Sequence, residues 1–278
     1  MMSLFFYCWA YIKEKTRIHH QHLRLGEERP GLCCKGMKKQ RFNKLFFEKC
    51  FSVARMRPYF NRYSGDERKA IRHYEQNIQL AESLGPSLSV FEVTLRNALI
   101  QELEIMAGQK EWYRAFNSQS SLYSLNKYIT TAEHHIIARG ETITADKING
   151  ELTLGFWVSL FNAEHEKYLW KHLRRAFPNL PKSERQRKNV SAPLNAIRTL
   201  RNRVYHNEAI SWNIRRLTTL HQTIIRVISW MNIALPQWLL KLDHYKRVSS
   251  RVEIEWYGRQ KYLCNRIIQI FLPFCRAH

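Results

Sequence analysis

The chain is organised around a stretch that reads Leu200-Arg201-Asn202-Arg203-Val204-Tyr205-His206-Asn207-Glu208, in the middle of a helical run. Arginine is a permanent cation that grips a phosphate through two hydrogen bonds, and histidine can both accept and donate a proton near neutral pH. This pair of residue types is suited to RNA cleavage. On a straight helix Arg201 and His206 would lie roughly 140° apart, whereas Asn202 and His206 would share one face. A site built from two copies across a two-fold axis is therefore geometrically easier than a site built from one.

The stretch resembles the motif of the HEPN superfamily of ribonucleases, which is an Arg, a polar residue, and a His four to six positions after the Arg. The chain is similar, more closely, to the Abi-like family of bacterial abortive-infection proteins, whose pattern reads roughly Leu-Arg-Asn-Arg, two residues, His, one residue, Glu. Three other stretches agree with that family in order and approximate spacing, namely residues 91–99, 154–161 and 194–198. The resemblance covers about residues 56–245 and leaves both ends unexplained.

The resemblance implies an all-α fold, a helical bundle of HEPN type with additional N-terminal helices. It also implies a metal-independent endoribonuclease of an abortive-infection or toxin–antitoxin defence system against phage, without a cofactor. The ribose 2′-hydroxyl would attack the adjacent phosphorus and leave a cyclic phosphate, so that DNA would not be cut. His206 would act as general acid or base, Arg201 would hold the phosphate, and Asn202 would orient His206 or a phosphate oxygen.

Seven further residues are expected to support this site or to contact RNA: Arg203, Glu208, Arg96, Glu92, Arg185, Arg187 and Lys188. Arg203 is interpreted as a second phosphate contact or as a surface charge. The resemblance places Glu92 or Arg96 at the border of the site, although the two can also form an ordinary i, i+4 surface pair. The basic stretch 182–188 is either a positive lip that guides RNA or a solvated loop.

Glu208 departs from those HEPN proteins that carry a Tyr two residues past the His as a modification target. That form of regulation is therefore not expected here. As partners, the resemblance implies RNA, a second copy of the chain in a homodimer with a composite active site, and an antitoxin that is a protein or an RNA.

Two other interpretations stay open. The motif can be a basic helix end, with Arg201 in a salt bridge and His206 near the C-terminus, where the helix dipole favours a cation. The chain can also be a non-catalytic RNA-binding or regulatory helical protein of the same fold. A third class, a helical interaction module without a nucleic-acid role, is disfavoured by the charge.

The charge balance is the strongest global feature. The 278 residues include 45 Lys and Arg against 23 Asp and Glu, a net charge of +22, which favours nucleic acid or an anionic surface as partner. The apolar run 4–12 is too short to cross a bilayer. None of the six cysteines lies between Phe51 and Leu263, which argues against a disulfide scaffold and indicates a reducing, cytoplasmic compartment in a bacterium.

Three regions are expected. Residues 1–55 form a basic N-terminal extension that is poorly ordered or not native, residues 56–245 form the Abi-like helical domain, and residues 246–278 are a tail that adds a helix or is unrelated sequence. His19, His20 and His22 lie near Cys33 and Cys34, but their spacing does not match the usual paired zinc ligands. No metal site is expected.

The apolar periodicity predicts a succession of helices and no sheet. One helix is expected after the cap at residues 64–67, ended by Gly85-Pro86, which would also start the next helix. Asn149-Gly150 is a turn signal. The aromatic block 152–161 is expected in the core. The motif helix is expected over residues 191–205 with Pro193 in its first turn, followed by a turn at residues 207–213 and a long helix over residues 214–233.

Overall fold

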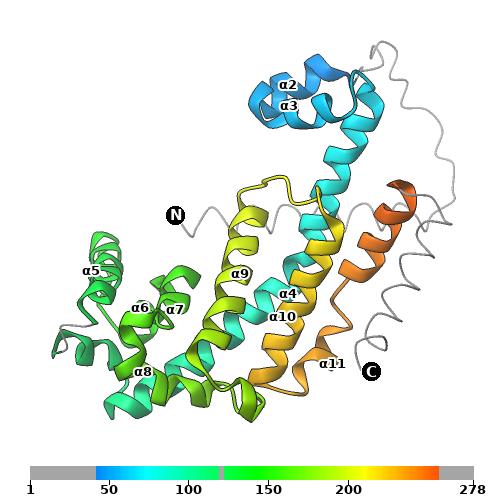
Figure 1. Cartoon of the computed structure of the whole chain (residues 1–278). Helices are drawn as coiled ribbons and strands as arrows, with labels where there is room; N and C mark the ends of the chain where they lie inside the picture. The colour runs from blue at the N-terminus through cyan, green and yellow to red at the C-terminus, as the bar shows by residue number, and fades with distance from the viewer. Residues whose placement is uncertain (1–41, 119–121, 257–278) are drawn as a thin grey trace, which may run out of the picture. The chain divides into compact units, whose positions relative to one another are not determined.

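The computed structural model describes residues 42–118 and 122–256, and within these ranges every regular element is a helix (Figure 1). The all-α prediction is confirmed for this part of the chain. Residues 19–34, with the His and Cys cluster, and residues 257–278 lie outside the described residues. None of the described helices combines the length and the apolarity that a bilayer span requires.

The longest element is α4 (Glu67–Ala107), a helix of 41 residues. Asp66 caps its start, because its side chain accepts a hydrogen bond from the Lys69 backbone N–H at 3.1 Å. Gly108 ends it in the left-handed conformation, at φ 69°. Seven apolar residues form its buried stripe: Leu80, Leu84, Leu88, Phe91, Leu95, Leu99 and Leu103. Around this stripe the main core of the protein is assembled.

The predicted break at Gly85-Pro86 is wrong, because α4 runs through both residues. Pro86 removes the hydrogen bond that its N–H would donate to the carbonyl of Glu82. Glu82 is exposed, so water can solvate the freed carbonyl. The buried stripe continues on both sides of Pro86, and this packing outweighs the local signal for a helix end.

Replacing Pro86 with Ala should raise the free energy of unfolding by about 1–3 kcal/mol, since a proline inside a helix costs a hydrogen bond and a steric clash. Urea unfolding followed by circular dichroism at 222 nm measures this change. An unchanged or lower stability would mean that the helix depends on a bend at Pro86.

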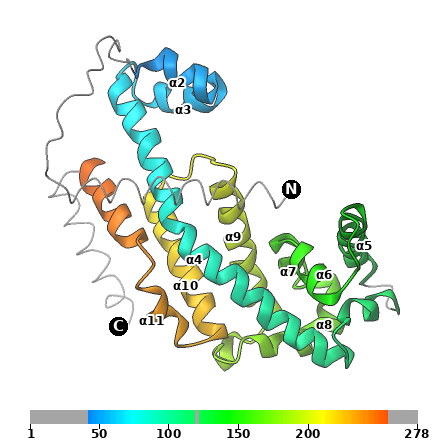
Figure 2. The same ribbon diagram turned by 180° about the vertical axis from the view of Figure 1, so that it is seen from behind.

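Helix α10 (Ile214–Met231) packs against both α4 and α9 (Arg187–Tyr205), as both views show (Figures 1 and 2). Leu194, Ile197 and Leu200 form the buried face of α9. The predicted end of the motif helix at residue 205 is confirmed. Its predicted start is wrong, because α9 begins at Arg187 and Pro193 is its seventh residue rather than part of its first turn.

Short helices cover one end of α4. They are α5 (Tyr123–Ala138), α6 (Ala145–Glu151), α7 (Leu154–Ser159) and α8 (Glu166–Leu173), with 3₁₀ turns η1 (Trp112–Ser118), η3 (Ala163–His165), η4 (Arg174–Ala176) and η5 (Lys182–Glu184). Trp112, Phe156 and Trp157 are buried, with ring centroids within 6.0 Å of one another. The block 152–161 is therefore core, as predicted. The predicted turn at Asn149-Gly150 is wrong, because both residues lie in α6.

Residues before position 56 and after position 245 also pack. Helices α2 (Lys44–Phe51) and α3 (Val53–Arg62) enclose a second apolar cluster with α4, in which Phe47, Tyr59 and Tyr74 are buried. After α11 (Leu235–Leu239), residues 245–256 are helical up to the end of the part that the structure describes. Glu255 in this segment accepts hydrogen bonds from Arg72 of α4 at 3.1 Å. The compact unit therefore starts at Asn43 and includes the helix that follows residue 245.

Candidate functional site

Arg201 is held by a carboxylate from another helix. Its Nε donates to Oε2 of Glu92 at 3.1 Å, and its Nη2 donates to Oε1 at 3.3 Å. This two-point pair joins α9 to α4, with side-chain exposures of 29% for Arg201 and 26% for Glu92. The structure thus pairs Glu92 with Arg201 rather than with Arg96. A fork-to-fork pair of this kind fixes the plane of the guanidinium as well as its position.

Tyr205 lies under the same guanidinium. The Arg201 Cζ is 4.6 Å from the centroid of the Tyr205 ring, within the range of a cation–π contact. Burial raises the pKa of the Tyr205 hydroxyl, and the charge of Arg201 partly opposes that rise. Since Glu92 engages only Nε and one N–H of Nη2, Arg201 keeps three N–H groups that point away from this carboxylate.

His206 terminates α9, and its side chain is exposed, as is that of Asn202. The backbone N–H of His206 donates to the carbonyl of Asn202 at 2.9 Å. Asn207 follows in the left-handed region at φ 53°, a conformation that asparagine tolerates better than most residues. The helix therefore ends at Tyr205, and the imidazole of the cap residue His206 is accessible to solvent.

The chain after His206 is clamped from two helices. Arg55 of α3 donates to the carbonyls of Asn207 and His206. The buried Asn77 of α4 donates from Nδ2 to the carbonyl of Glu208 at 3.2 Å, and its Oδ1 accepts from the N–H groups of residues 210 and 211 at 2.8 and 3.0 Å. Both clamps fix the backbone that carries His206.

Sequence reasoning missed Arg55 and Asn77. Arg55 belongs to residues 1–55, the predicted extension, and no sequence pattern links it to the motif. Asn77 lies between the apolar positions Tyr74 and Leu80 of a helical pattern. A polar side chain at a core position of this kind was the one available signal, because such a group needs hydrogen-bond partners when it is buried.

Arg203 and Glu208 interact with each other. Nε of Arg203 donates to Oε2 of Glu208 at 3.1 Å, and its Nη2 donates to the carbonyl of Ala209. The side chains are 44% and 52% exposed. In this arrangement Arg203 stabilises the turn after α9, and its charge faces a carboxylate.

The three basic residues before and at the start of α9 differ in their surroundings. Arg185 donates to the carbonyls of Leu180 and Pro178, at 3.0 and 3.3 Å. Arg187 donates to Glu166 at 2.8 Å and to the carbonyl of Phe161 at 2.9 Å. Lys188 is exposed. Arg185 and Arg187 therefore fasten the segment that leads into α9, and Lys188 presents its charge to solvent.

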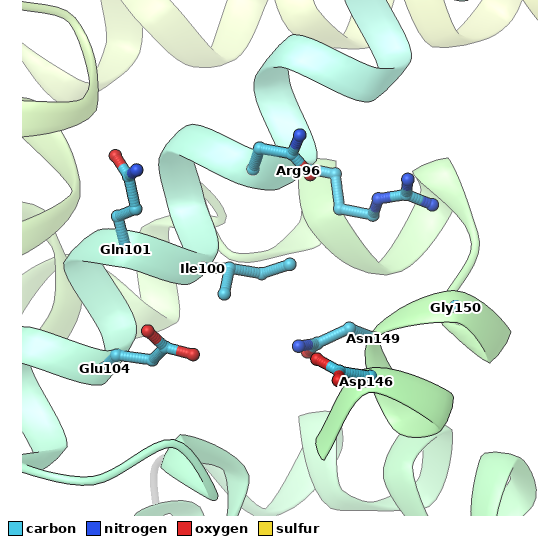
Figure 3. Close-up of a pocket in the computed structure, with 8 residues that line it drawn as sticks. Arg96, Ile100, Gln101, Glu104, Asp146, Asn149 and Gly150 are labelled. Carbon is cyan, nitrogen blue, oxygen red and sulfur yellow. The ribbon is translucent and has the colours of Figure 1, made fainter. Parts of the chain in front are cut away.

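Arg96 lies one turn beyond Glu92 on α4 and lines a cleft between α4 and α6 (Figure 3). The structure thus brings Arg201, Glu92 and Tyr205 together, and it places Arg96 beside them along the helix. Within residues 42–118 and 122–256, no group of three or more His, Cys, Asp or Glu side chains is arranged to hold a metal ion.

Comparisons of the chain with protein-family models, with curated proteins and with solved structures give no match.

Proposed function

We propose that this chain is a metal-independent endoribonuclease of HEPN type that acts in an abortive-infection or toxin–antitoxin defence system. The observation that carries the proposal is the two-point pair between Arg201 and Glu92, next to a helix end that exposes His206. This pair connects two of the stretches that resemble the Abi-like family, although Glu92 and Arg201 are 109 residues apart in sequence. The pair with Glu92 fixes the orientation of the Arg201 guanidinium and leaves three of its N–H groups to donate to other acceptors. A phosphate is bound by N–H donors that are fixed in this way.

The proposed reaction is transesterification within RNA. The 2′-oxygen forms a bond to phosphorus, the bond from phosphorus to the 5′-oxygen breaks, and the proton of the 2′-hydroxyl passes to a base while the 5′-oxygen gains a proton. His206 performs these proton transfers, and Arg201 offsets the charge that develops on the phosphoryl oxygens. Asn202 orients the imidazole or a phosphate oxygen. The products are a 2′,3′-cyclic phosphate and a 5′-hydroxyl.

The proposal includes a homodimer with a composite site. Since α9 is helical through Tyr205, Arg201 and His206 of one copy face directions roughly 140° apart. Two copies related by a two-fold axis would supply both groups to one phosphate. A protein or RNA antitoxin and a location in the bacterial cytoplasm belong to the same proposal.

The test is incubation of the purified chain with total RNA in excess EDTA. We expect fragments with a 2′,3′-cyclic phosphate, detected by the resistance of their 3′ ends to ligation until the cyclic phosphate is removed, and with a 5′-hydroxyl that a kinase can label directly. Single-stranded DNA of matched sequence should remain intact, because it lacks the 2′-hydroxyl. Tight RNA binding without any cleavage would contradict the catalytic proposal.

A second candidate function is RNA binding without cleavage. It is favoured by the ion pairs themselves, since Arg201, Arg203 and Arg187 each face a carboxylate. In this interpretation the pairs stabilise the helix bundle, and other surface lysines and arginines bind the phosphate backbone.

Replacing Glu92 with Gln separates the two candidates. If Glu92 orients a catalytic Arg201, cleavage should fall by about 10- to 100-fold, because a misplaced catalytic group costs about that much. RNA affinity should stay equal or rise, since a negative charge has been removed near the phosphate. The measurements are the cleavage rate at saturating RNA and the dissociation constant at fixed salt. Glu82→Gln, which changes an exposed carboxylate on the same helix, is the matched control.

A further inference from the structure

The cleft between α4 and α6 is lined by polar groups from both helices. Glu104 and Arg96 extend from α4, and Asp146 and Asn149 extend from α6. Figure 3 shows the Glu104 carboxylate facing Asp146 and Asn149 across the cleft, with Ile100 between the two sides. The cleft therefore combines an apolar surface with several hydrogen-bonding groups, as small-molecule sites commonly do.

The amide of Asn149 has a defined orientation. Its Oδ1 accepts a hydrogen bond from Nε1 of the buried Trp112 at 3.1 Å. An indole N–H can only donate, so the atom beside it must be the amide oxygen. Asn149 is 7% exposed, and its Nδ2 faces the cleft in Figure 3. Asn149 therefore offers a fixed donor beside the carboxylate of Asp146 on α6, and the carboxylate of Glu104 lies across the cleft from both.

One donor and two carboxylate acceptors complement the Watson–Crick edge of guanine. Guanine presents the acceptor O6 and then the donors N1–H and N2–H₂, whereas cytosine, adenine and uracil present other orders. Asn149 would donate to O6, and the carboxylates of Glu104 and Asp146 would accept from N1–H and N2–H₂. Ile100 offers an apolar surface to the face of the base, and the guanidinium of Arg96 is suited to the attached phosphate.

The cleft lies further along the helix that carries Glu92. Glu92, Arg96, Ile100 and Glu104 follow one another at steps of four residues, and each step advances about 6 Å along α4 and turns about 40° around it, so that Arg96 stays close to the face of Glu92 and Glu104 lies about 120° round the helix. Glu92 holds Arg201 at the start of this row, and Arg96 and Glu104 line the cleft further along. An RNA strand that runs along α4 past Arg96 and partly around the helix can reach both places.

We propose that the cleft between α4 and α6 is a guanine-nucleotide subsite that selects where single-stranded RNA is bound. The subsite rests on the proposed ribonuclease function for its role in cleavage, whereas its ligand preference stands on the contacts of the cleft alone. Glu104, Asp146 and Asn149 read the base, and Arg96 holds a phosphate.

The test is isothermal titration of the full chain with GMP, AMP, CMP and UMP. GMP should bind at least about tenfold more tightly than the other three, because each of them leaves a carboxylate or the Asn149 amide unpaired. Glu104→Ala should weaken GMP binding by about tenfold or more. Asn149→Asp keeps an acceptor for Trp112 but loses the donor, and it should weaken GMP binding as well. Glu82→Ala, which removes an exposed carboxylate from the same helix, should bind GMP like the unmodified chain.

Equal affinity for the four nucleotides, or GMP binding that Glu104→Ala leaves unchanged, overturns the guanine subsite. Cleavage is scored separately, in EDTA with a defined RNA. Preferred cleavage next to guanosines that becomes scattered in Glu104→Ala supports the subsite. Cleavage without any such preference overturns its role in selection and leaves the ribonuclease proposal standing. GMP selectivity without cleavage supports the subsite and counts against the ribonuclease.

Discussion

Replacing His206 with Ala should lower the rate of RNA cleavage by about a hundred- to ten-thousandfold, the usual range for the loss of a general acid or base. The imidazole is exposed at the end of α9, so its removal leaves no cavity and no buried group without a partner. The circular dichroism spectrum and the urea midpoint should therefore stay the same. The rate is measured with a fluorescently labelled RNA in excess EDTA.

Two variants make this result interpretable. His134→Ala removes another exposed histidine, on α5, and should cleave like the unmodified chain. Arg201→Ala should lose cleavage to a comparable degree, and it should also lose some stability, because it leaves Glu92 without its ion pair. Undiminished cleavage by His206→Ala would remove this histidine from the mechanism, and a parallel loss of helical content would assign it a structural role.

Some helix ends follow from local chemistry. Asp66 caps α4, Gly108 ends it, and Gly140 at φ 70° follows α5. These residues act through their own side chain or backbone conformation, so a reader of the sequence can identify them. The continuity of α4 through Pro86 could not be identified in this way, since it depends on packing against elements distant in sequence.

The residues proposed for the candidate site can be chosen from the sequence, whereas their contacts cannot. Arg201, His206 and Asn202 came from one short stretch, where spacing along a helix is informative. The partner of Glu92 was not predictable from spacing, because a local candidate, Arg96, stood four residues away and the actual partner 109 residues away. The clamps from Arg55 and Asn77 bridge comparable separations. Contacts between residues more than 100 residues apart depend on how the helices cross. The spacing of apolar residues in the sequence does not specify this crossing.

Acidification should weaken the anchor of the turn that follows α9. His73 of α4 is buried, and its Nε2 is 2.9 Å from Oγ of Ser211, while its Nδ1 is 3.1 Å from the hydroxyl of Tyr63. The rings of Trp212 and Trp256 lie against it, with centroids 4.7 and 4.4 Å away. Burial, with a smaller contribution from the charge of Arg62, lowers the pKa of His73 to about 4.

The sign of the pH effect follows from this lowered pKa. In the unfolded chain His73 regains an ordinary pKa of about 6.5, so between about pH 6.5 and pH 4 the unfolded state binds a proton that the folded state does not bind. The stabilisation is complete above about pH 6.5 and is lost as the pH falls towards 4. A difference of about 2.5 pKa units corresponds to about 3 kcal/mol.

His73→Gln isolates this contribution, because a glutamine can form hydrogen bonds at the same place and does not titrate. Urea unfolding at pH 7 and at pH 4 gives the loss of stability on acidification for each protein. The loss should be about 3 kcal/mol larger for the unmodified chain than for the His73→Gln variant, and carboxylates that titrate in the same range cancel in this comparison. Equal losses would mean that His73 accepts a proton in the folded protein as readily as in the unfolded chain. In that case the hydrogen bond from Ser211 to His73 would not depend on a neutral imidazole. The attachment to α4 of the turn that follows His206 would then not depend on it either.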